Sequence, residues 1–535
     1  MESNLQKIEH IVVLMLENRS FDNMLGFLGA SEGTGQKING VAGKQLSNPI
    51  PEYALPPEGQ KDVPVGIETK MTNPNPDPGE EYAHVNTQLF GQVIPEENRD
   101  QAFDKKPAEP YNLPKLESYT NAPMNGFVID YINHFHALVG RMPDYEEYKV
   151  IMNCFAEESV PVLSTLAKEF AVFDMWFASV PSQTLCNRSF LHTSTSHGYV
   201  LNMPFYHWLW HDTPTIFNRI EEKHDPALTW KIYYDKLDIV SSTGLQHRAL
   251  WKYRNTNFFH MDDFESDAAH GTLPSYAFVE PRFFIDHNDQ HPPLGDVLET
   301  SSVLAGELLI HRVYNALRNG KGWDRTLLII TYDEHGGCYD HVSPPAAIPP
   351  EPGVPVGEQG FKFDRLGVRV PTVMVSPYIE KGTVISDIHD HTSISKFLCD
   401  RWDLQPLTER DKYANTFRNV LNRTTPRKRE DTPTITPRAY TIPRNALDEP
   451  VTDLHKAALF IMAGFDDASQ LIGDKNLFHK AQDLFQLVVD EKRIAHIKTV
   501  GQAIHFAIGF DRRVTRHLSF FEWLQVKLKL LFQWI

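Results

Sequence analysis

The stretch "IEHIVVLMLENRSFDNMLGFLG", residues 8–29, changes character abruptly at its centre. The apolar run Ile11–Leu16 is followed directly by Glu17 and Asn18. A short apolar run rich in β-branched residues predicts a buried strand. Ser20 predicts the N-cap of a helix over Phe21–Phe27. The open question is why an acid and an amide follow a buried strand without a spacer.

Further runs of the same kind predict more strands of one sheet. Thr326–Tyr332 and Val370–Val375 resemble the first run and are expected to be buried parallel strands. Shorter candidate strands begin at Thr229 and Ser275.

Helical patterns lie between these runs. Ser159–Phe170 carries Pro161 in a first-turn position, and the amphipathic run Leu294–Leu317 is closed by Asn319 and Gly320. Strands that alternate with helices predict an α/β fold, with helices flanking a central, mostly parallel sheet.

The composition is that of a soluble globular protein, with 41% hydrophobic and 23% charged residues in a chain of 535. A formal net charge of -17 argues against general nucleic-acid binding, because neutralising phosphates requires a basic surface. The four cysteines are too few and too scattered for a disulfide framework. No apolar stretch reaches the length of a transmembrane segment, and the first residues lack the features of a secretory signal. We therefore expect a cytoplasmic protein, or one exported without a classical signal peptide.

The composition also divides the chain into three regions. Residues 1–409 carry all the strand candidates and form the expected catalytic domain. Residues 410–449 are polar and rich in proline, which predicts a linker or a strap over the surface. Residues 450–535 show a helical pattern and form the expected smaller C-terminal region.

Polar side chains follow two of the predicted strands at the point where each strand ends. Glu17 and Asn18 follow the first strand, and Asp333 and Glu334 follow the strand that ends at Tyr332. Ligands of open α/β sheets bind at the carboxyl ends of the strands, and oxygen ligands suit a hard or borderline divalent cation. The alternative is that these residues only cap and form salt bridges at the strand ends.

Between these segments lies "FASVPSQTLCNRSFLHTSTSHG", which is dense in hydroxyl groups. A hydroxyl such as that of Thr184 is a poor nucleophile unless a base or a metal ion lowers its pKa. Asn187 and Arg188 follow within four residues and could hold a tetrahedral anion through charge-assisted hydrogen bonds. The same stretch could equally be a polar turn of no catalytic importance.

Histidines supply candidate proton donors. His287 and His291 follow a predicted strand, and His389 and His391 precede a helix that Thr392 or Ser393 could cap. Histidine titrates in the range that protonation of a leaving alkoxide requires, although many of these rings serve structure alone.

Taken together, these segments resemble the bacterial and plant phosphoesterase family. This family includes non-specific and phosphatidylcholine-preferring phospholipases C and an acid phosphatase, and it belongs to the alkaline-phosphatase superfamily. The resemblance runs in order from about Ile8 to Phe417. It rests on the motifs "ENRSFDNMLG", "MNGFV", "SVPSQTLCNR", "NDQHPP", "TYDEHGGCYDHV" and "FDRLGVRVPTVMVSPYIEKGTV".

The resemblance implies roles for individual residues. It implies a divalent metal ion, calcium or zinc, with Thr184 as both nucleophile and ligand. The other implied ligands are Glu17, Asn18, Asp333 and Glu334. Asn187, Arg188, Glu80 and His335 are expected at the phosphate, and His291 or His391 is expected to act as the general acid.

One position departs from the family pattern. Plant members carry a histidine in an early "PGH" loop, where this sequence reads "DPGEEYAH" and has Glu80. Either Glu80 takes that place, His84 substitutes for the histidine, or the chemistry around the phosphate differs.

The expected activity is that of a metal-dependent phospholipase C. Such an enzyme would cleave glycerophospholipids such as phosphatidylcholine to diacylglycerol and a phosphorylated head group, through a phosphothreonine intermediate. The alternatives are an acid phosphatase that acts on soluble phosphomonoesters and a member that only binds its ligand.

The last residues carry a separate expectation. From Arg512 to the end, basic residues alternate with aromatic and aliphatic ones, which is typical of a helix that lies in a membrane interface. The expected partner is then a phospholipid surface, with peripheral membrane association. The alternative is that this tail docks on the chain's own catalytic domain.

Overall fold

The computed structural model describes residues 4–29, 38–54, 56–99, 106–115, 119–203, 206–209, 211–238, 240–283, 287–293, 301–351, 353 and 356–440. The described residues fall almost entirely in one compact unit, Met1–Pro204 with Trp208–Arg444. The expected helical region 450–535 and its tail from Arg512 lie outside the described residues. Within the described residues, none of the helices combines the length and apolarity needed to cross a membrane.

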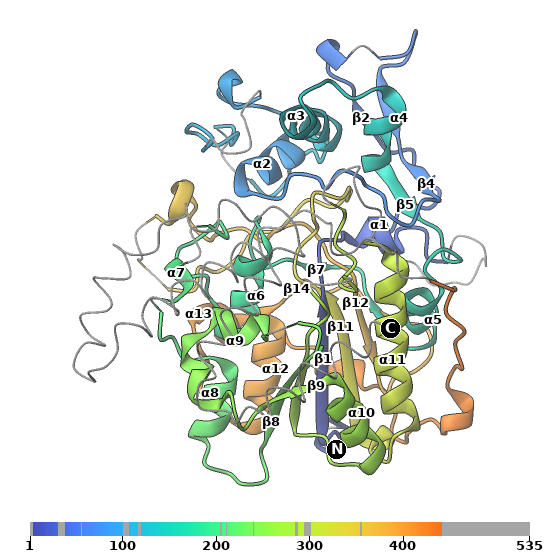
Figure 1. Ribbon diagram of the computed structural model, residues 1–535, viewed down its shortest axis with the longest axis vertical. Coiled ribbons are helices and arrows are strands. Elements are labelled where there is room, and N and C mark those ends of the chain that lie inside the picture. Colours follow the sequence, from blue (N-terminus) through green and yellow to red (C-terminus); the bar gives the residue numbers. More distant parts are fainter. Residues whose placement is uncertain are drawn as a thin grey trace, which may run out of the picture. The chain divides into compact units, whose positions relative to one another are not determined.

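An eight-stranded sheet forms the centre of this unit (Figure 1). Every neighbouring pair is parallel except the two pairs that involve β12. The predicted α/β fold with a mostly parallel central sheet is therefore confirmed. The spatial order is β13 (Thr383–Ile385), β6 (Ala171–Phe173), β12 (Thr372–Val375), β11 (Thr326–Tyr332), β1 (His10–Leu16), β10 (Tyr276–Val279), β8 (Trp230–Tyr234) and β9 (Phe258–His260).

Strand β12 corrects one expectation, because it runs antiparallel to β11 and not parallel to it. A parallel connection must cross back over a face of the sheet, usually as a helix. The described residues between β11 and β12 contain no α-helix. The chain therefore leaves β11 and re-enters the sheet in β12 at the same end of the strands.

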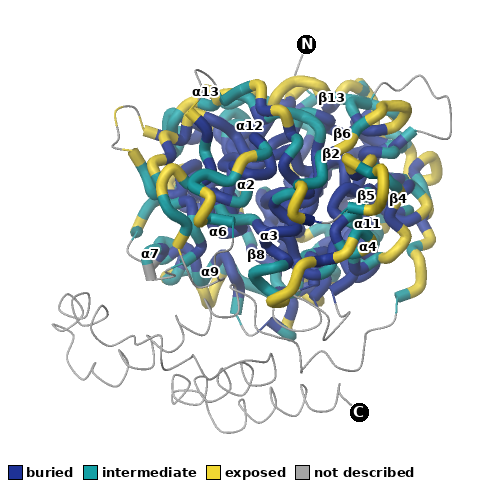
Figure 2. Tube along the Cα trace, turned by 90° about the horizontal axis from the view of Figure 1, so that it is seen from above, coloured by how far each residue is buried: buried dark blue, intermediate teal, exposed yellow. Residues whose placement is uncertain are grey.

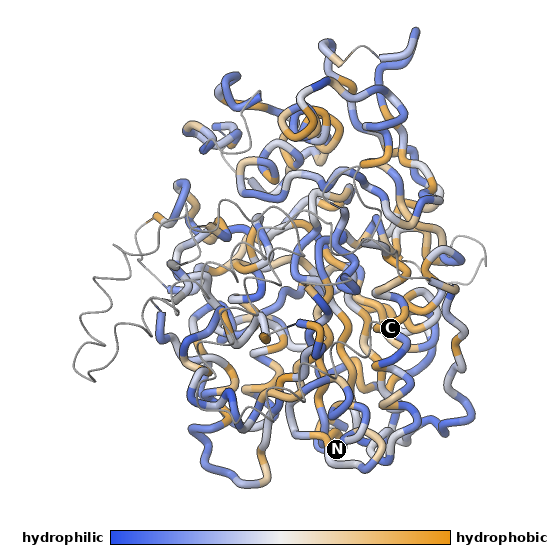
Figure 3. Tube along the Cα trace, in the orientation of Figure 1, coloured by the Kyte–Doolittle hydropathy of each residue, from blue (hydrophilic) through white to orange (hydrophobic). Residues whose placement is uncertain are grey.

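Helices cover both faces of the sheet (Figure 1). α5 (Pro161–Glu169), α10 (Met261–His270) and α11 (Val303–Asn319) pack in sequence on one face. α6 (Thr184–Thr193), α8 (Ile216–Glu222) and α12 (Thr392–Trp402) pack on the other. Burial on both faces explains why β1 is apolar along its length, and Figure 3 shows hydrophobic segments along the central strands.

The helix boundaries follow their local signals with three exceptions. α11 was expected from Leu294, but it begins at Val303 with Ser302 as its N-cap. Ser20 caps α1 (Phe21–Leu25) as predicted, by accepting a hydrogen bond from the Asn23 backbone N–H at 3.1 Å, but the helix ends at Leu25. α12 begins at Thr392 with His391 in the N-cap position, so neither Thr392 nor Ser393 caps it.

A second hydrophobic cluster lies beyond the carboxyl end of β1, and its buried residues are dark blue in Figure 2. Its residues come from α2 (Tyr82–Phe90), α3 (Phe127–Val139), α4 (Tyr145–Tyr148), β3 (Asp62–Pro64) and β5 (Asn153–Phe155). The short strands β2 (Ser47–Pro49) and β4 (Gly66–Glu68) pair with β3 and β5. This part of the chain covers the sheet edge at which the polar residues emerge (Figure 1).

The described part of the predicted linker runs along the unit that contains the sheet. The Tyr314 hydroxyl on α11 donates to the Pro433 carbonyl at 2.8 Å, and Arg318 Nη2 donates to the Arg429 carbonyl at 3.0 Å. Arg410 is buried and donates to the Ser179 carbonyl at 3.0 Å. All four cysteines are buried and unpaired.

Candidate active site

The pairing of β1 with β11 places two acidic segments side by side. Leu16 is in register with Tyr332, and the contact continues past the strand ends. The Asn18 backbone N–H donates to Asp333 Oδ1 at 3.2 Å, and the Arg19 N–H donates to the Glu334 carbonyl at 3.1 Å. The four residues Glu17, Asn18, Asp333 and Glu334 therefore share one edge of the sheet.

The two turns at this edge need unusual backbone conformations. Asn18 has a φ of 54°, in the left-handed region that asparagine tolerates better than most residues. Gly336 has a φ of 57°, and a Cβ atom there would lie 2.3 Å from the Asn18 carbonyl oxygen. Glycine at 336 thus allows the second turn to close against the first.

Thr184 is the first residue of α6 and faces this edge. Its Oγ1 lies 3.5 Å from Asn18 Oδ1, and its side chain is almost completely buried. The N-terminus of a helix carries a partial positive charge, which stabilises an anion such as a phosphate or an alkoxide.

The side chain of Asn187 forms hydrogen bonds with the backbone of the loop before α6. Its Oδ1 accepts from the Val180 N–H at 3.0 Å, and its Nδ2 donates to the Ser182 carbonyl at 2.7 Å. These bonds hold the loop before α6 and use both ends of the amide. Among the described residues, the contacts of Asn187 thus support the loop before Thr184, and its place at the phosphate stays a prediction.

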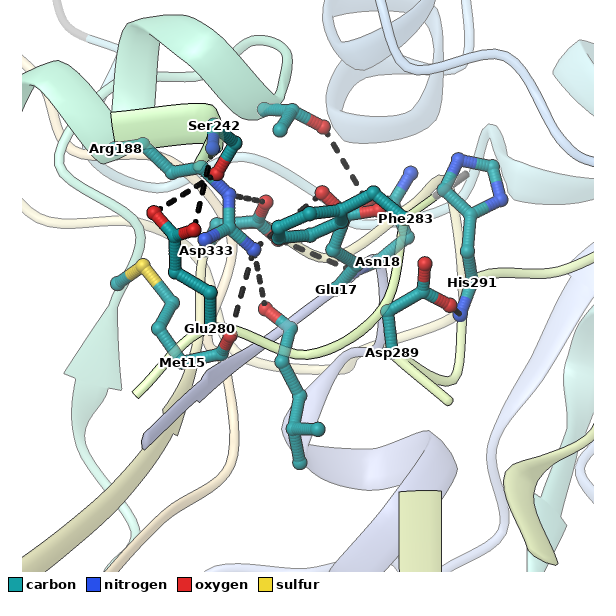
Figure 4. A network of polar contacts seen from close by, with 12 residues as sticks. Met15, Glu17, Asn18, Arg188, Ser242, Glu280, Phe283, Asp289, His291 and Asp333 are labelled. Atoms are coloured by element: carbon teal, nitrogen blue, oxygen red, sulfur yellow. Dashed lines mark hydrogen bonds and ion pairs between the residues drawn. The ribbon is translucent and has the colours of Figure 1, made fainter. Parts of the chain in front are cut away.

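Arg188 links the two acidic segments (Figure 4). Its Nε donates to Asp333 Oδ2 at 3.0 Å, and its Nη2 lies 3.3 Å from Glu17 Oε1. The guanidinium group packs over the ring of Phe283, with its carbon 4.8 Å from the ring centroid. Its Nη1 is buried and has no hydrogen-bond partner among the described residues. This nitrogen is a donor that a substrate oxygen could use.

The carboxyl groups at this edge are short of positive charge. Burial raises the pKa of Glu17 well above its usual value, although Arg188 acts in the opposite direction. Burial and the neighbouring Asp333 likewise raise the pKa of Glu334. Burial also raises the pKa of Asp333, against the effect of Arg188.

Glu80 joins this group from the loop before α2. Its Oε2 accepts a short hydrogen bond from Asn18 Nδ2, and its Oε1 accepts from Gln183 Nε2 at 3.2 Å. Burial, followed by the neighbouring Glu334, raises its pKa well above the usual value. Ligand atoms of Asp77, Glu80 and His291 all lie within 4.8 Å of one another.

His84 pairs with Asp130 on α3. Its Nδ1 lies 2.8 Å from Asp130 Oδ1. Burial alone would lower the pKa of His84, but the charge of Asp130 raises it to about 9. Glu80, and not His84, therefore contacts the side chains around Thr184.

His291 lies in a loop that is bound to the same edge. The Asp289 carbonyl accepts from the Glu17 N–H at 2.9 Å, and Asp289 Oδ1 accepts from the His291 N–H at 3.0 Å. His291 Nδ1 donates to the Pro292 carbonyl at 2.7 Å, so Nε2 is the nitrogen that carries the lone pair in the neutral ring. Burial lowers its pKa, although Asp289 raises it in part.

The other two predicted histidines have structural partners. His391 Nε2 lies 2.6 Å from the Asp333 carbonyl, and Trp176 Nε1 lies 3.5 Å from its Nδ1. His335 Nε2 lies 2.7 Å from Gln88 Oε1. Burial lowers the pKa of both rings to about 4. Neither ring is protonated near neutral pH.

Several residues of the site were not predicted from the sequence. Gln183 contacts Glu80, Gln88 contacts His335, and Asp77 adds a carboxylate to the Glu80 loop. Asp77 could have been predicted as a site residue, since it precedes Glu80 by three residues in the same loop. The two glutamines could not have been predicted, because a single glutamine forms no recognisable sequence motif.

The arrangement fits a divalent cation. Glu334 Oε1 is buried and has no hydrogen-bond partner among the described residues. Glu17 Oε1 is also buried, and its contact with Arg188 is an ion pair without hydrogen-bond geometry. Carboxylate and amide oxygens are the ligands that calcium prefers, and a nearby histidine also suits zinc. Glu17, Asn18, Asp333 and Glu334 could hold such an ion beside Thr184.

Comparison with known proteins places the sequence among enzymes that cleave phosphate esters. The sequence profile of the Phosphoesterase family matches residues 8–405. Non-specific phospholipase C6 of Arabidopsis thaliana is 36% identical over 439 residues, which cover 78% of this chain and 73% of the relative. Non-specific phospholipase C3 of the same plant is also 36% identical, over 79% of this chain and 75% of the relative.

A bacterial relative and a solved structure complete the comparison. Phospholipase C B of Mycobacterium tuberculosis is 27% identical over 75% of this chain and 74% of the relative. A solved structure of a protein in the alkaline phosphatase superfamily from Vibrio parahaemolyticus aligns with 51% of this chain and 65% of its own, at 11% identity and a TM-score of 0.29. The assignment to a family rests on the sequence matches.

Proposed function

The chain belongs to the phosphoesterase family, and on that premise we propose that it is a metal-dependent phospholipase C. The proposed substrates are glycerophospholipids such as phosphatidylcholine. The observation that carries the proposal is the position of the Thr184 hydroxyl, at the N-terminus of α6 and 3.5 Å from Asn18 Oδ1.

In the proposed reaction, Thr184 Oγ1 attacks the phosphorus atom in line with the leaving oxygen. The bond to the diacylglycerol oxygen breaks, and a phosphothreonine forms that water then hydrolyses. A divalent cation, when bound by Glu17, Asn18, Asp333 and Glu334, would lower the pKa of the hydroxyl and neutralise charge on the phosphate.

The chain's own residues support the charge that develops. Arg188 Nη1 can donate to an equatorial phosphate oxygen, because no described residue occupies it. The N-terminus of α6 stabilises the same charge through the dipole of the helix.

His291 is the better candidate for the general acid. His391 donates from Nε2 to the Asp333 carbonyl, whereas no described residue forms a hydrogen bond with His291 Nε2. Burial lowers the pKa of His291, so the proton-donating form of the ring is favoured at acidic pH. A phosphatase that acts on soluble phosphomonoesters would use the same residues, and the two functions differ in substrate reach alone.

The test is Thr184→Ala, with Thr184→Ser as the matched control that keeps a hydroxyl. We expect the alanine variant to lose at least about three orders of magnitude in kcat on phosphatidylcholine, with a Tm close to wild type. Mass spectrometry after acid quench should find phosphate on the peptide that contains Thr184. A Thr184→Ala enzyme with a tenth of the wild-type kcat would refute this nucleophile. Turnover of aryl phosphate but not of phospholipid would favour the phosphatase.

A further inference from the structure

We propose that Glu80 is a positioning residue that orients the amide side chains of Asn18 and Gln183 around Thr184. The inference rests on the proposed function in one respect, since it takes Thr184 as the nucleophile and Asn18 as a ligand of the cation. It assigns Glu80 a task other than binding phosphate.

The first part of the argument concerns the orientation of Asn18. An amide has a donor end and an acceptor end, and its neighbours decide which end faces which way. Both oxygens of Glu80 accept hydrogen bonds from amide groups, whatever proton its carboxyl shares with Glu334. Because Asn18 Nδ2 donates to Glu80 Oε2, Asn18 Oδ1 is the end that faces the Thr184 hydroxyl. The opposite orientation would turn an N–H donor toward the nucleophile and the cation, and an N–H group cannot coordinate a cation.

The second part concerns Gln183, the N-cap residue of α6. Its Nε2 donates to Glu80 Oε1 at 3.2 Å, and its Oε1 accepts from the Asn202 N–H at 3.0 Å. The two oxygens of Glu80 thus connect the end of β1 with the start of α6. The ligand Asn18 and the nucleophile Thr184 on these elements are 166 residues apart in the chain.

Glu80 itself is held in place by its loop. Gln88 Nε2 donates to the Gly79 carbonyl at 2.7 Å, and the Tyr131 hydroxyl donates to the Pro76 carbonyl at 2.9 Å. The Asp77 N–H donates to the Pro293 carbonyl at 2.8 Å. A carboxylate anchored in this way can orient flexible amides, because it does not have to be ordered by them.

The third part concerns the residue type. A neutral histidine has one acceptor nitrogen, so a histidine at position 80 could not accept from Asn18 and Gln183 together. Among the described residues, no lysine or arginine forms an ion pair with Glu80, and the neighbouring group is the carboxyl of Glu334. Two acceptor oxygens in this place suit a bridge between two amide donors.

The experiment compares four variants of the full chain: Glu80→Gln, Glu80→Asp, Glu80→His and, as the matched control, Glu81→Gln. We measure the affinity for Ca²⁺ and Zn²⁺ by calorimetry and kcat and KM on phosphatidylcholine. Glu80→Gln should weaken the cation about 10- to 100-fold and lower kcat by a similar factor, with KM little changed. Glu80→Asp should recover part of both losses, Glu80→His should resemble Glu80→Gln, and Glu81→Gln should resemble wild type.

Two results would overturn the proposal. A Glu80→His enzyme with wild-type kcat and cation affinity would mean that position 80 contacts the phosphate. Loss of one whole equivalent of bound cation in Glu80→Gln would make Glu80 a ligand, together with Asp77 and His291.

A readout without turnover separates this proposal from the proposed function. In a double-mutant cycle of chemical unfolding, Gln183→Met should destabilise wild type more than it destabilises Glu80→Gln, because the shared hydrogen bond is already lost. Additive effects would refute the bridge at Glu80. A wild-type chain that binds no cation and cleaves no phosphate ester would instead refute the proposed function.

Discussion

Two buried arginines in this molecule each contact two carboxyl groups and an aromatic ring, yet they differ in hydrogen bonding and in the charge around them. Arg188 contacts Asp333 and Glu17 and packs over a phenylalanine ring. Arg369 contacts Asp340 at 2.9 Å and Asp22 at 3.0 Å and also packs over a phenylalanine ring. We call Arg369 with Asp22, Asp340 and His341 the Arg369 cluster.

The first difference is the number of guanidinium nitrogens that form hydrogen bonds. Arg369 Nη1 donates to the Asn39 carbonyl at 2.9 Å and to the Asp174 carbonyl at 2.6 Å, so every nitrogen of its guanidinium group is bonded. Lys44 Nζ lies 2.6 Å from His341 Nε2 and brings a second positive charge to the cluster. Arg188 leaves Nη1 unbonded, and the acids around it outnumber the cations.

The comparison teaches that geometry alone does not identify a metal site. Asp22, Asp340 and His341 also have ligand atoms within 4.8 Å of one another. The charges of Arg369 and Lys44 already neutralise them, so we infer a structural role. Uncompensated charge and an unused donor distinguish the edge at Arg188, and the following predictions test that distinction.

The largest effect should follow from Arg369→Gln. This change leaves two buried carboxylates without their partner, and such a loss typically costs about 3–5 kcal/mol of unfolding free energy. Urea unfolding should report this loss, and the folded fraction should keep wild-type kcat and metal content. A variant with wild-type stability and no activity would move this cluster into the catalytic machinery.

Arg188→Gln should lower activity strongly and stability less than Arg369→Gln does. We expect kcat to fall by about 10²- to 10³-fold, the usual result of removing one donor to a transition-state oxyanion. In the metal-loaded protein the unfolding free energy should fall less than in Arg369→Gln, because the cation neutralises the same carboxylates. Steady-state kinetics and urea unfolding of both variants give this contrast, and equal losses of stability would contradict it.

A smaller effect is expected from pH in the metal-depleted protein. The folded chain keeps protons on Glu17, Glu80 and Glu334 that the unfolded chain releases above about pH 4.5. The unfolding free energy should therefore fall steadily as the pH rises from 5 to 7.5. Added Ca²⁺ or Zn²⁺ should remove this slope. Glu334→Gln is the control, and an identical slope in that variant would assign the pH dependence elsewhere.

The smallest effect should follow from His84→Gln. The pKa of His84 is raised to about 9, so its pairing with Asp130 contributes below pH 6.5 and is lost as the pH rises through 9. Its side chain is 30% exposed, and we expect a loss below about 1 kcal/mol at pH 6. Activity should not change, since Glu80 serves the site. A tenfold loss of kcat would show that His84 replaces the family histidine after all.

The sequence predicted the elements that carry strong local signals. The runs that end at Leu16 and Tyr332 stop at abrupt changes from apolar to polar residues, and both strands end there. Ser20 has an N-cap composition, and the cap is present. Because parallel strands expose their carboxyl ends at one edge, the grouping of the two acidic segments followed from the strands themselves.

The rest depends on partners that are distant in the chain. The direction of β12 is set by a long loop without a crossover helix, and an apolar run contains no information on direction. The amide of Asn187 could face a phosphate or its own loop, and only the position of the Val180 and Ser182 backbone decides. The contacts of Glu80 with Asn18 and Gln183 are equally invisible in a single sequence.

The four buried thiols make opening of the molecule measurable without a label. Cys338 lies in the turn that follows Asp333 and Glu334, and Cys186 lies two residues after Thr184, whereas Cys399 lies on α12. Burial raises the pKa of Cys338 to about 11, so a thiol reagent reacts with it only when the turn opens. A cation or substrate that closes this edge should slow modification of Cys338 and Cys186 and leave the rate at Cys399 unchanged. The native chain thus contains its own kinetic probes of the catalytic edge, together with an internal reference.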